Sequence, residues 1–342
     1  MKTGLQVFVL MLLSMPAIAD PPYSGTVFVD PDILLPSDPS TFVQVVDAGS
    51  GSRQVFDRRT NVSGIIDALL FNAYYSDTGT VEIQVNPEFG AIEAASKAAF
   101  YGHAIGQLPL ALRVDVLTVT IHKGDEAFGG GNNNILIHTD SPGYHGEWLE
   151  ETIFHEACHT SLDSRIANTS SWISAQTTDP DFISTYARDN PNREDVAESC
   201  LLYYALRYSG ERVAADTLTT ISTTIANRIL VLDSHNINPV LSADRASFFD
   251  SDNQKLTLTG VEVEGVYYEV ILSLTDAESL LFTADSAVTV AQPNSNLASV
   301  FADGVVSVPL LLAVGERYSI SLALHNENPV QFRLTSAVKL TD

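Results

Sequence analysis

Positively charged side chains are scarce in this chain. It contains 18 lysine and arginine residues against 42 aspartate and glutamate residues, which gives a formal net charge of −24 at pH 7. Nucleic acids and anionic lipid surfaces attract proteins with an excess of positive charge. The composition therefore argues against both, and we expect no nucleic acid as a partner. An acidic surface suits a secreted protein in a saline setting, although solubility alone is enough to explain it.

Long hydrophobic runs are absent beyond the first residues of the chain. The initial segment carries Lys2, then an apolar core from Leu5 to Met15, then an Ala-Ile-Ala sequence that ends at Ala19. This order is typical of a signal peptide, and the apolar core is too short to cross a membrane as a helix. We therefore expect residues 1–19 to be a cleavable signal peptide, no membrane span elsewhere, and a secreted or periplasmic protein.

Proline and glycine are absent from the stretch between Glu147 and Arg165, and this stretch contains the pattern His155-Glu156-x-x-His159. On a helix, residues four apart leave the same face, so the two imidazoles can hold one metal ion. Glu156 lies about 100° around the helix from His155, where it can reach a metal-bound water without binding the metal. The pattern is typical of zinc hydrolases with a carboxylate general base. The alternative is a solvated helix that carries two histidines.

A catalytic zinc ion usually takes three protein ligands, so a third ligand is expected. Asp163, one turn beyond His159, is better placed to orient an imidazole N–H than to bind the metal. The segment 192–206 follows an Asn-Pro helix-start signal and carries Glu194 and Glu198 on one helical face. One of the two can bind the metal while the other hydrogen-bonds a ligand histidine. Acidic residues also favour a helix N-terminus for purely electrostatic reasons.

The order of these residues resembles the gluzincin metallopeptidases of the anthrax lethal factor type. The sequence has H-E-x-x-H at residues 155–159, then Tyr186, then Glu194-x-x-Ala-Glu198. The resemblance implies that Glu194 is the third zinc ligand, that Glu198 supports a ligand histidine, and that Tyr186 stabilises the oxyanion. It also implies a zinc-dependent endopeptidase in which Glu156 accepts a proton from water and delivers it to the leaving amine. The host-protein substrates of the toxin are not implied, because nothing outside residues 155–198 matches it.

Cysteine is nearly absent as well, with only Cys158 and Cys200 in the sequence. One lies inside the H-E-x-x-H pattern and the other on the later helix. If both helices bind one metal they are neighbours, so a disulfide between them is geometrically reasonable, and export to an oxidising compartment permits it. Two buried free thiols are the alternative. Cys158 is offset from both histidines and is therefore a poor zinc ligand.

The region before residue 239 mixes expected helices and strands, in the order typical of a zincin: a small twisted sheet packed on an active-site helix. The expected strands are 42–46, 81–85, 114–122 and 134–138, and the expected helices are 62–75, 87–106, 147–165, 192–206 and 211–232. We expect Ile135–Ile137 to be an edge strand that borders the cleft, with a core strand as the alternative. The glycine-rich segment 128–134 is expected to be a flexible loop.

After residue 238 the pattern changes to short alternating segments separated by turn signals. Six strands are expected, at residues 255–259, 267–274, 287–290, 305–312, 317–324 and 330–334. The predicted fold class is therefore α+β, with a zincin-like catalytic domain over residues 20–238 and a C-terminal all-β sandwich domain over residues 239–342. The second domain is interpreted as an accessory domain that binds an unknown ligand or stabilises the catalytic domain.

These patterns together predict an exported zinc-dependent endopeptidase that acts on a peptide or protein substrate. The main alternative is a secreted binding or adhesion protein whose zinc site is structural. An intact Glu156 favours the enzyme, because a structural site needs no general base. A zinc hydrolase that acts on something other than protein is a further alternative.

Overall fold

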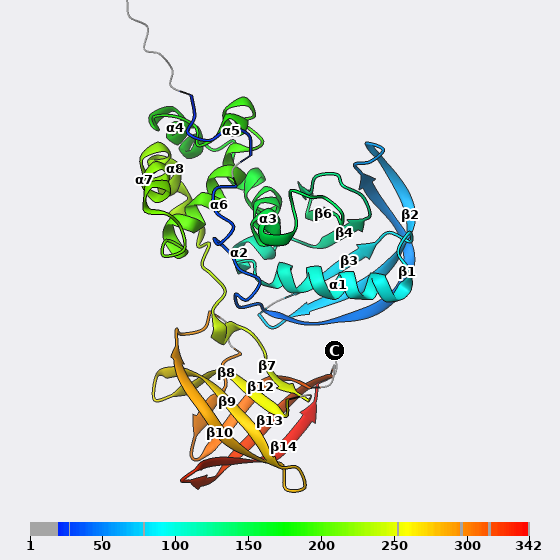
Figure 1. The fold of residues 1–342 in the computed structure, drawn as a ribbon, viewed down its shortest axis with the longest axis vertical. Coiled ribbons are helices and arrows are strands. Elements are labelled where there is room, and N and C mark those ends of the chain that lie inside the picture. Colours follow the sequence, from blue (N-terminus) through cyan, green and yellow to red (C-terminus); the bar gives the residue numbers. More distant parts are fainter. Residues whose placement is uncertain are drawn as a thin grey trace, which may run out of the picture.

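The computed structural model describes residues 20–340, except positions 27, 78, 252, 295, 296, 314 and 315. The signal peptide predicted for residues 1–19 lies outside the described residues. Figure 1 shows a part that mixes helices and strands, followed in the sequence by a part built from strands. Among the described residues, no helix combines the length and the apolar character needed to cross a membrane.

The first part contains a six-stranded sheet with the order β1-β2-β3-β4-β6-β5. Strands β3, β4 and β6 run parallel to one another, whereas β1, β2 and β5 pair antiparallel with their neighbours. The strands are β1 (Phe42–Asp57), β2 (Val62–Tyr75), β3 (Thr80–Val85), β4 (Thr118–His122), β5 (Gly129–Gly131) and β6 (Asn134–His138). The strands expected near residues 42, 81, 114 and 134 are present, and β1 is much longer than expected.

The segment Val62–Tyr75 is strand β2, so the prediction of a helix there is wrong. It forms a long antiparallel hairpin with β1 and pairs with β3 on its other side. Phe71, Ala73 and Tyr75 are buried, which is the period of two that a strand requires. The apolar residues of this segment also fit the spacing of a helix. The segment is nevertheless extended, because it pairs with a neighbouring strand on each side.

The edge strand next to the helix that carries His155 and His159 is β5, so the prediction that Ile135–Ile137 forms the edge is wrong. Strand β6 lies between β4 and β5, and both isoleucines are fully buried. The expected flexible loop is therefore partly a strand. Gly130 in this strand has a steric reason, because a Cβ atom there would lie 2.0 Å from the backbone oxygen of Glu156. Only glycine lets β5 lie directly against this helix.

Eight α-helices accompany the sheet among the described residues. They are α1 (Ala91–Gly106), α2 (Leu110–Arg113), α3 (Leu149–Ile166), α4 (Ser170–Thr178), α5 (Thr185–Asp189), α6 (Asp195–Tyr208), α7 (Ala215–Thr224) and α8 (Ala226–Leu232). Helix α3 lies between the sheet and α6 (Figure 1). Its Ile153, Phe154 and Ala157 are fully buried, which fixes the orientation of the helix. The single closing helix expected at residues 211–232 is divided into α7 and α8.

The C-terminal strands form one eight-stranded sheet, with the order β11-β12-β13-β14-β10-β9-β8-β7. Additional pairing of β7 with β12 and of β11 with β8 closes the sheet on itself. The strands are β7 (Ser247–Asp250), β8 (Lys255–Val263), β9 (Val266–Asp276), β10 (Leu281–Val290), β11 (Val300–Ala302), β12 (Val305–Ala313), β13 (Glu316–Glu327) and β14 (Val330–Lys339). All six expected strands are present. The closed sheet differs from the expected sandwich of two sheets, because the unpredicted short strands β7 and β11 join its ends.

Candidate metal centre

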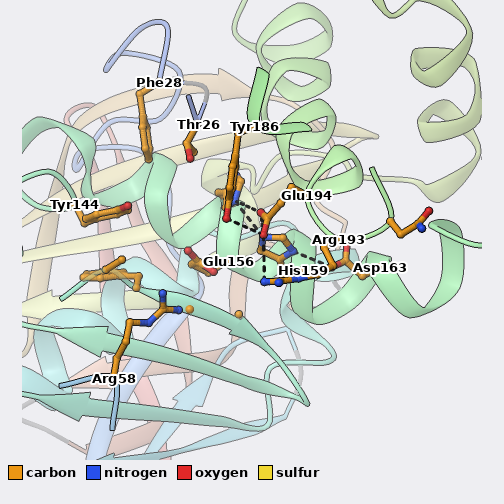
Figure 2. A pocket seen from close by; sticks show the side chains of 16 residues that line it. Thr26, Phe28, Arg58, Tyr144, Glu156, His159, Asp163, Tyr186, Arg193 and Glu194 are labelled. Carbon is orange, nitrogen blue, oxygen red and sulfur yellow. Dashed lines mark hydrogen bonds and ion pairs between the residues drawn. The ribbon is translucent and has the colours of Figure 1, made fainter. Parts of the chain in front are cut away.

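Three side chains from two helices converge at one point. His155 and His159 come from α3, and Glu194 stands immediately before α6. The Nε2 atom of His159 lies 3.1 Å from the Nε2 atom of His155 and 3.1 Å from Oε2 of Glu194 (Figure 2). The distance from His155 Nε2 to Glu194 Oε2 is 3.9 Å. These are the three residues for which the sequence predicts metal binding.

The distances fit a tetrahedral ion. A zinc ion binds histidine nitrogen and carboxylate oxygen at about 2.0–2.2 Å, which places neighbouring ligand atoms about 3.3–3.6 Å apart in a tetrahedron. The three observed separations, from 3.1 to 3.9 Å, bracket this value. Two imidazoles and one carboxylate are a typical donor set for zinc, and other first-row divalent metals accept the same ligands.

An acidic side chain lies on the Nδ1 side of each imidazole. Asp163 Oδ2 lies 2.8 Å from Nδ1 of His159, so this nitrogen donates to the carboxylate and Nε2 is turned toward the other ligands. Glu198 Oε1 lies 4.0 Å from Nδ1 of His155, and Ser184 donates a hydrogen bond to its other oxygen at 2.7 Å. Glu198 therefore lies behind a histidine, whereas Glu194 reaches the ligand position. Sequence reasoning did not identify Ser184.

The charge states of the two histidines differ in the metal-free protein. Burial lowers the pKa of His155 to about 3, and the neighbouring His159 contributes to this shift. Burial also lowers the pKa of His159, but its hydrogen bonds to Asp163 and Glu194 outweigh this effect and raise the pKa to about 10. A metal ion must therefore displace a proton from His159 in order to bind.

Glu156 lies in the same cavity but outside the group of three ligands. Figure 2 shows its carboxylate between Tyr144 and the ligand group. The side chain is buried, and this burial raises its pKa to about 7, although the charges of His159 and Arg58 oppose the shift. A carboxyl group with a pKa near neutrality can both accept and return a proton at physiological pH.

Tyr186 points into the ligand group from the short helix α5. Its hydroxyl donates a hydrogen bond to Oε1 of Glu194 at 3.0 Å. Burial and the negative charge of Glu194 raise the pKa of Tyr186 to about 12, so the hydroxyl keeps its proton. The capping residue Ser184 anchors α5, because its hydroxyl accepts from the backbone N–H of Ala187. The structure thus brings Tyr186 together with the three ligands.

A disulfide joins Cys158 on α3 to Cys200 on α6, with a Cα–Cα distance of 6.5 Å. Both residues are fully buried. Both cysteines of the sequence take part in this disulfide, so the alternative of two free thiols does not apply. The cross-link connects the helix that carries the two histidines to the helix that begins beside Glu194.

A buried cluster of charges fixes the start of α6. Arg228 of α8 is fully buried and lies 2.9 Å from Asp195 Oδ2 and 3.0 Å from Asp179 Oδ2. Asp195 directly follows Glu194, so the cluster also holds the backbone of this ligand in place. Sequence reasoning missed the cluster, since its three members come from segments with no shared pattern.

The cavity around the ligand group has a volume of about 270 Å³. Residues from five separate segments line it in addition to the predicted site residues. These lining residues include Thr26, Phe28, Arg58, Phe128, Tyr144, Asn192 and Arg193. None of them was expected from the sequence, because the loops that carry them meet only in the folded chain.

No family model, curated protein or solved structure compared with this chain matches it.

Proposed function

We propose that the protein is a zinc-dependent metalloendopeptidase with a zincin-like catalytic domain. The convergence of His155, His159 and Glu194 beside a buried glutamate that does not join them supports this proposal. Three protein ligands are the usual number for a catalytic zinc ion, whereas structural zinc sites usually have four. In this proposal the protein acts outside the cytoplasm, after residues 1–19 have been removed.

Each of these residues has its own role in the proposed reaction. A bound zinc ion would polarise the scissile carbonyl and make the attacking water more acidic. Glu156 accepts the proton of the water and later delivers it to the leaving amine, a task that suits a pKa of about 7. Tyr186 keeps its proton and donates a hydrogen bond to the developing oxyanion. Asp163 holds the ring of His159 in the tautomer that leaves Nε2 free to bind the metal.

A secreted binding or adhesion protein with a structural zinc site is the second candidate. It would need a fourth protein ligand, but among the described residues only three gather at this point. It also gives no reason for a buried carboxyl group at Glu156, since burial of an unpaired acid destabilises the folded protein. A zinc hydrolase with a non-protein substrate uses the same residues, so substrate screening must separate it from a peptidase.

One experiment tests both the metal and the base. We expect about one zinc ion per chain by elemental analysis, lost in Glu194→Ala and retained in Glu156→Gln. Glu156→Gln should lower peptide hydrolysis by about 10²–10⁴-fold, because the reaction then lacks its proton acceptor.

The matched control is Glu147→Gln, which changes an exposed glutamate near the same helix and should leave zinc content and hydrolysis unchanged. Hydrolysis by Glu156→Gln at the wild-type rate, or a purified protein that binds no zinc, would contradict the proposal. Absence of cleavage of a broad peptide library by the zinc-loaded wild type would favour the binding protein.

A further inference from the structure

Two arginines, Arg58 and Arg193, lie among the described residues that line the metal cavity, and Arg193 forms an ion pair with Glu194. Arg58 lies in the turn between β1 and β2, and Figure 2 shows its guanidinium group pointing toward Glu156. It lines the metal cavity together with Glu156, Glu194 and Asp163. In a chain with a net charge of −24, a cation at this place calls for a partner or a ligand.

Arg58 has no salt-bridge partner among the described residues, although it lines the same cavity as Glu156. Its neighbour Arg59 forms ion pairs with Asp57 and Glu88, and no ion pair of the described residues includes Arg58. Arg58 nevertheless belongs to the site, because it lines the same cavity as Glu156 and Tyr144. The guanidinium group is therefore available to a ligand and close to the proposed general base.

Arg58 also lines a second, polar groove of about 760 Å³. Gly129 and Gly130 of β5 line both the groove and the metal cavity, so the two adjoin at β5. The guanidinium group lies against the backbone of β5, since a Cβ atom at Gly129 would be 2.7 Å from Nη2 of Arg58. A peptide that extended from Glu156 into this groove would therefore come close to Arg58, which lines both.

We propose that Arg58 selects peptides that carry a carboxylate on one side of the scissile bond. This side is the part of the bound peptide that lies along β5. A planar guanidinium group binds a carboxylate through two parallel hydrogen bonds. The carboxylate comes from an aspartate or glutamate side chain or from the C-terminus of the peptide, since both present the same two oxygens. This specificity rests on the peptidase function proposed above, and Arg58 acts in it by binding the substrate.

The binding test uses zinc-loaded Glu156→Gln, in which the peptides should remain intact. Fluorescent peptides that differ by one Glu→Gln exchange, at positions on either side of the central bond, are compared by anisotropy. On one side of the central bond, we expect the peptide with glutamate to bind about tenfold more tightly than the peptide with glutamine. The free energy of this difference lies between those of exposed ion pairs and of buried charged hydrogen bonds. Adding Arg58→Gln should remove the difference, and adding Arg58→Glu should reverse it. Amidated and free-acid versions of each peptide distinguish a side-chain carboxylate from a C-terminal one.

The matched control is Arg59→Gln, which removes an adjacent arginine that lines neither cavity. It should keep the preference for the acidic peptide. In wild-type protein the same peptides should show the preference in KM, with a smaller change in kcat. Equal affinity for acidic and amide peptides, a preference that survives Arg58→Gln, or no peptide binding at all would each overturn the role of Arg58. Charge-dependent binding without hydrolysis by the wild type would instead overturn the peptidase function and leave the binding site in place.

Discussion

A methyl group added at Gly130 would place a carbon atom 2.0 Å from the backbone oxygen of Glu156. Side-chain carbons essentially never approach another heavy atom within 3.0 Å, so β5 and α3 must separate by about 1 Å in Gly130→Ala. Overpacking of this kind destabilises a protein by about 1–3 kcal/mol. For a domain of this size the loss corresponds to a melting temperature lower by about 2–12 °C.

Gly130→Ala should also lower the activity proposed for this site. A displacement of about 1 Å at a catalytic group lowers the rate by about 10²-fold. Zinc should be retained, because its ligands stand on α3 and beside α6, which the disulfide holds together. The assays are thermal unfolding, zinc content and hydrolysis of a peptide substrate.

Gly64→Ala provides the control for this prediction. Gly64 also lies in a strand of the same sheet, but a Cβ atom there would meet nothing within 4 Å. This variant should keep the wild-type melting temperature and activity. If Gly130→Ala behaves like Gly64→Ala, the direct contact between β5 and α3 does not position Glu156.

Two further predictions concern buried charges outside the ligand group. Arg228→Met should destabilise the protein by about 3–5 kcal/mol, or about 6–20 °C in melting temperature, because it leaves two buried aspartates without their counter-ion. A melting temperature within 2 °C of the wild type would refute this explanation of the cluster. Burial raises the pKa of Glu151 to about 8, so the folded protein keeps a proton there that the unfolded chain releases near pH 4.5. Stability should therefore fall as the pH rises from about 4.5 to 8, and Glu151→Gln should flatten this dependence in denaturant titrations. An unchanged slope in Glu151→Gln would show that Glu151 is not responsible.

The parts of the site that could be predicted from the sequence depend on local helical geometry. The spacing of His155 and His159 determines that both leave one face of α3, and it also leaves Glu156 outside the ligand group. The choice of Glu194 over Glu198 needed the resemblance to a family in addition, since helical spacing treats both alike. In the structure Glu194 lies beside both Nε2 atoms and Glu198 lies behind His155.

The parts that could not be predicted depend on contacts between distant segments. Strand β2 has an apolar spacing that fits a helix, and only its two neighbouring strands show that it is extended. Strand β5 is a run of glycines, of which Gly130 is required by the close approach of α3, and no local pattern reveals this contact. Arg58 and Tyr144 reach the cavity from separate loops, and nothing in their own sequence surroundings indicates this.

The disulfide between Cys158 and Cys200 affects how the protein would take up zinc, because it already holds the two helices near the metal site together. The cysteines are 42 positions apart, and closing a loop of this length lowers the entropy of the unfolded chain by an amount worth about 4 kcal/mol. Once the disulfide has formed, the metal no longer has to bring the two ligand helices together. A chelator should then remove zinc from a protein that stays folded and can take up the metal again. In the proposed function the chain is exported, and before export, in a reducing compartment, the same residues would lie on helices without a cross-link and would hold zinc less tightly. Under that proposal, the oxidation state of two cysteines would favour zinc-dependent activity outside the cytoplasm.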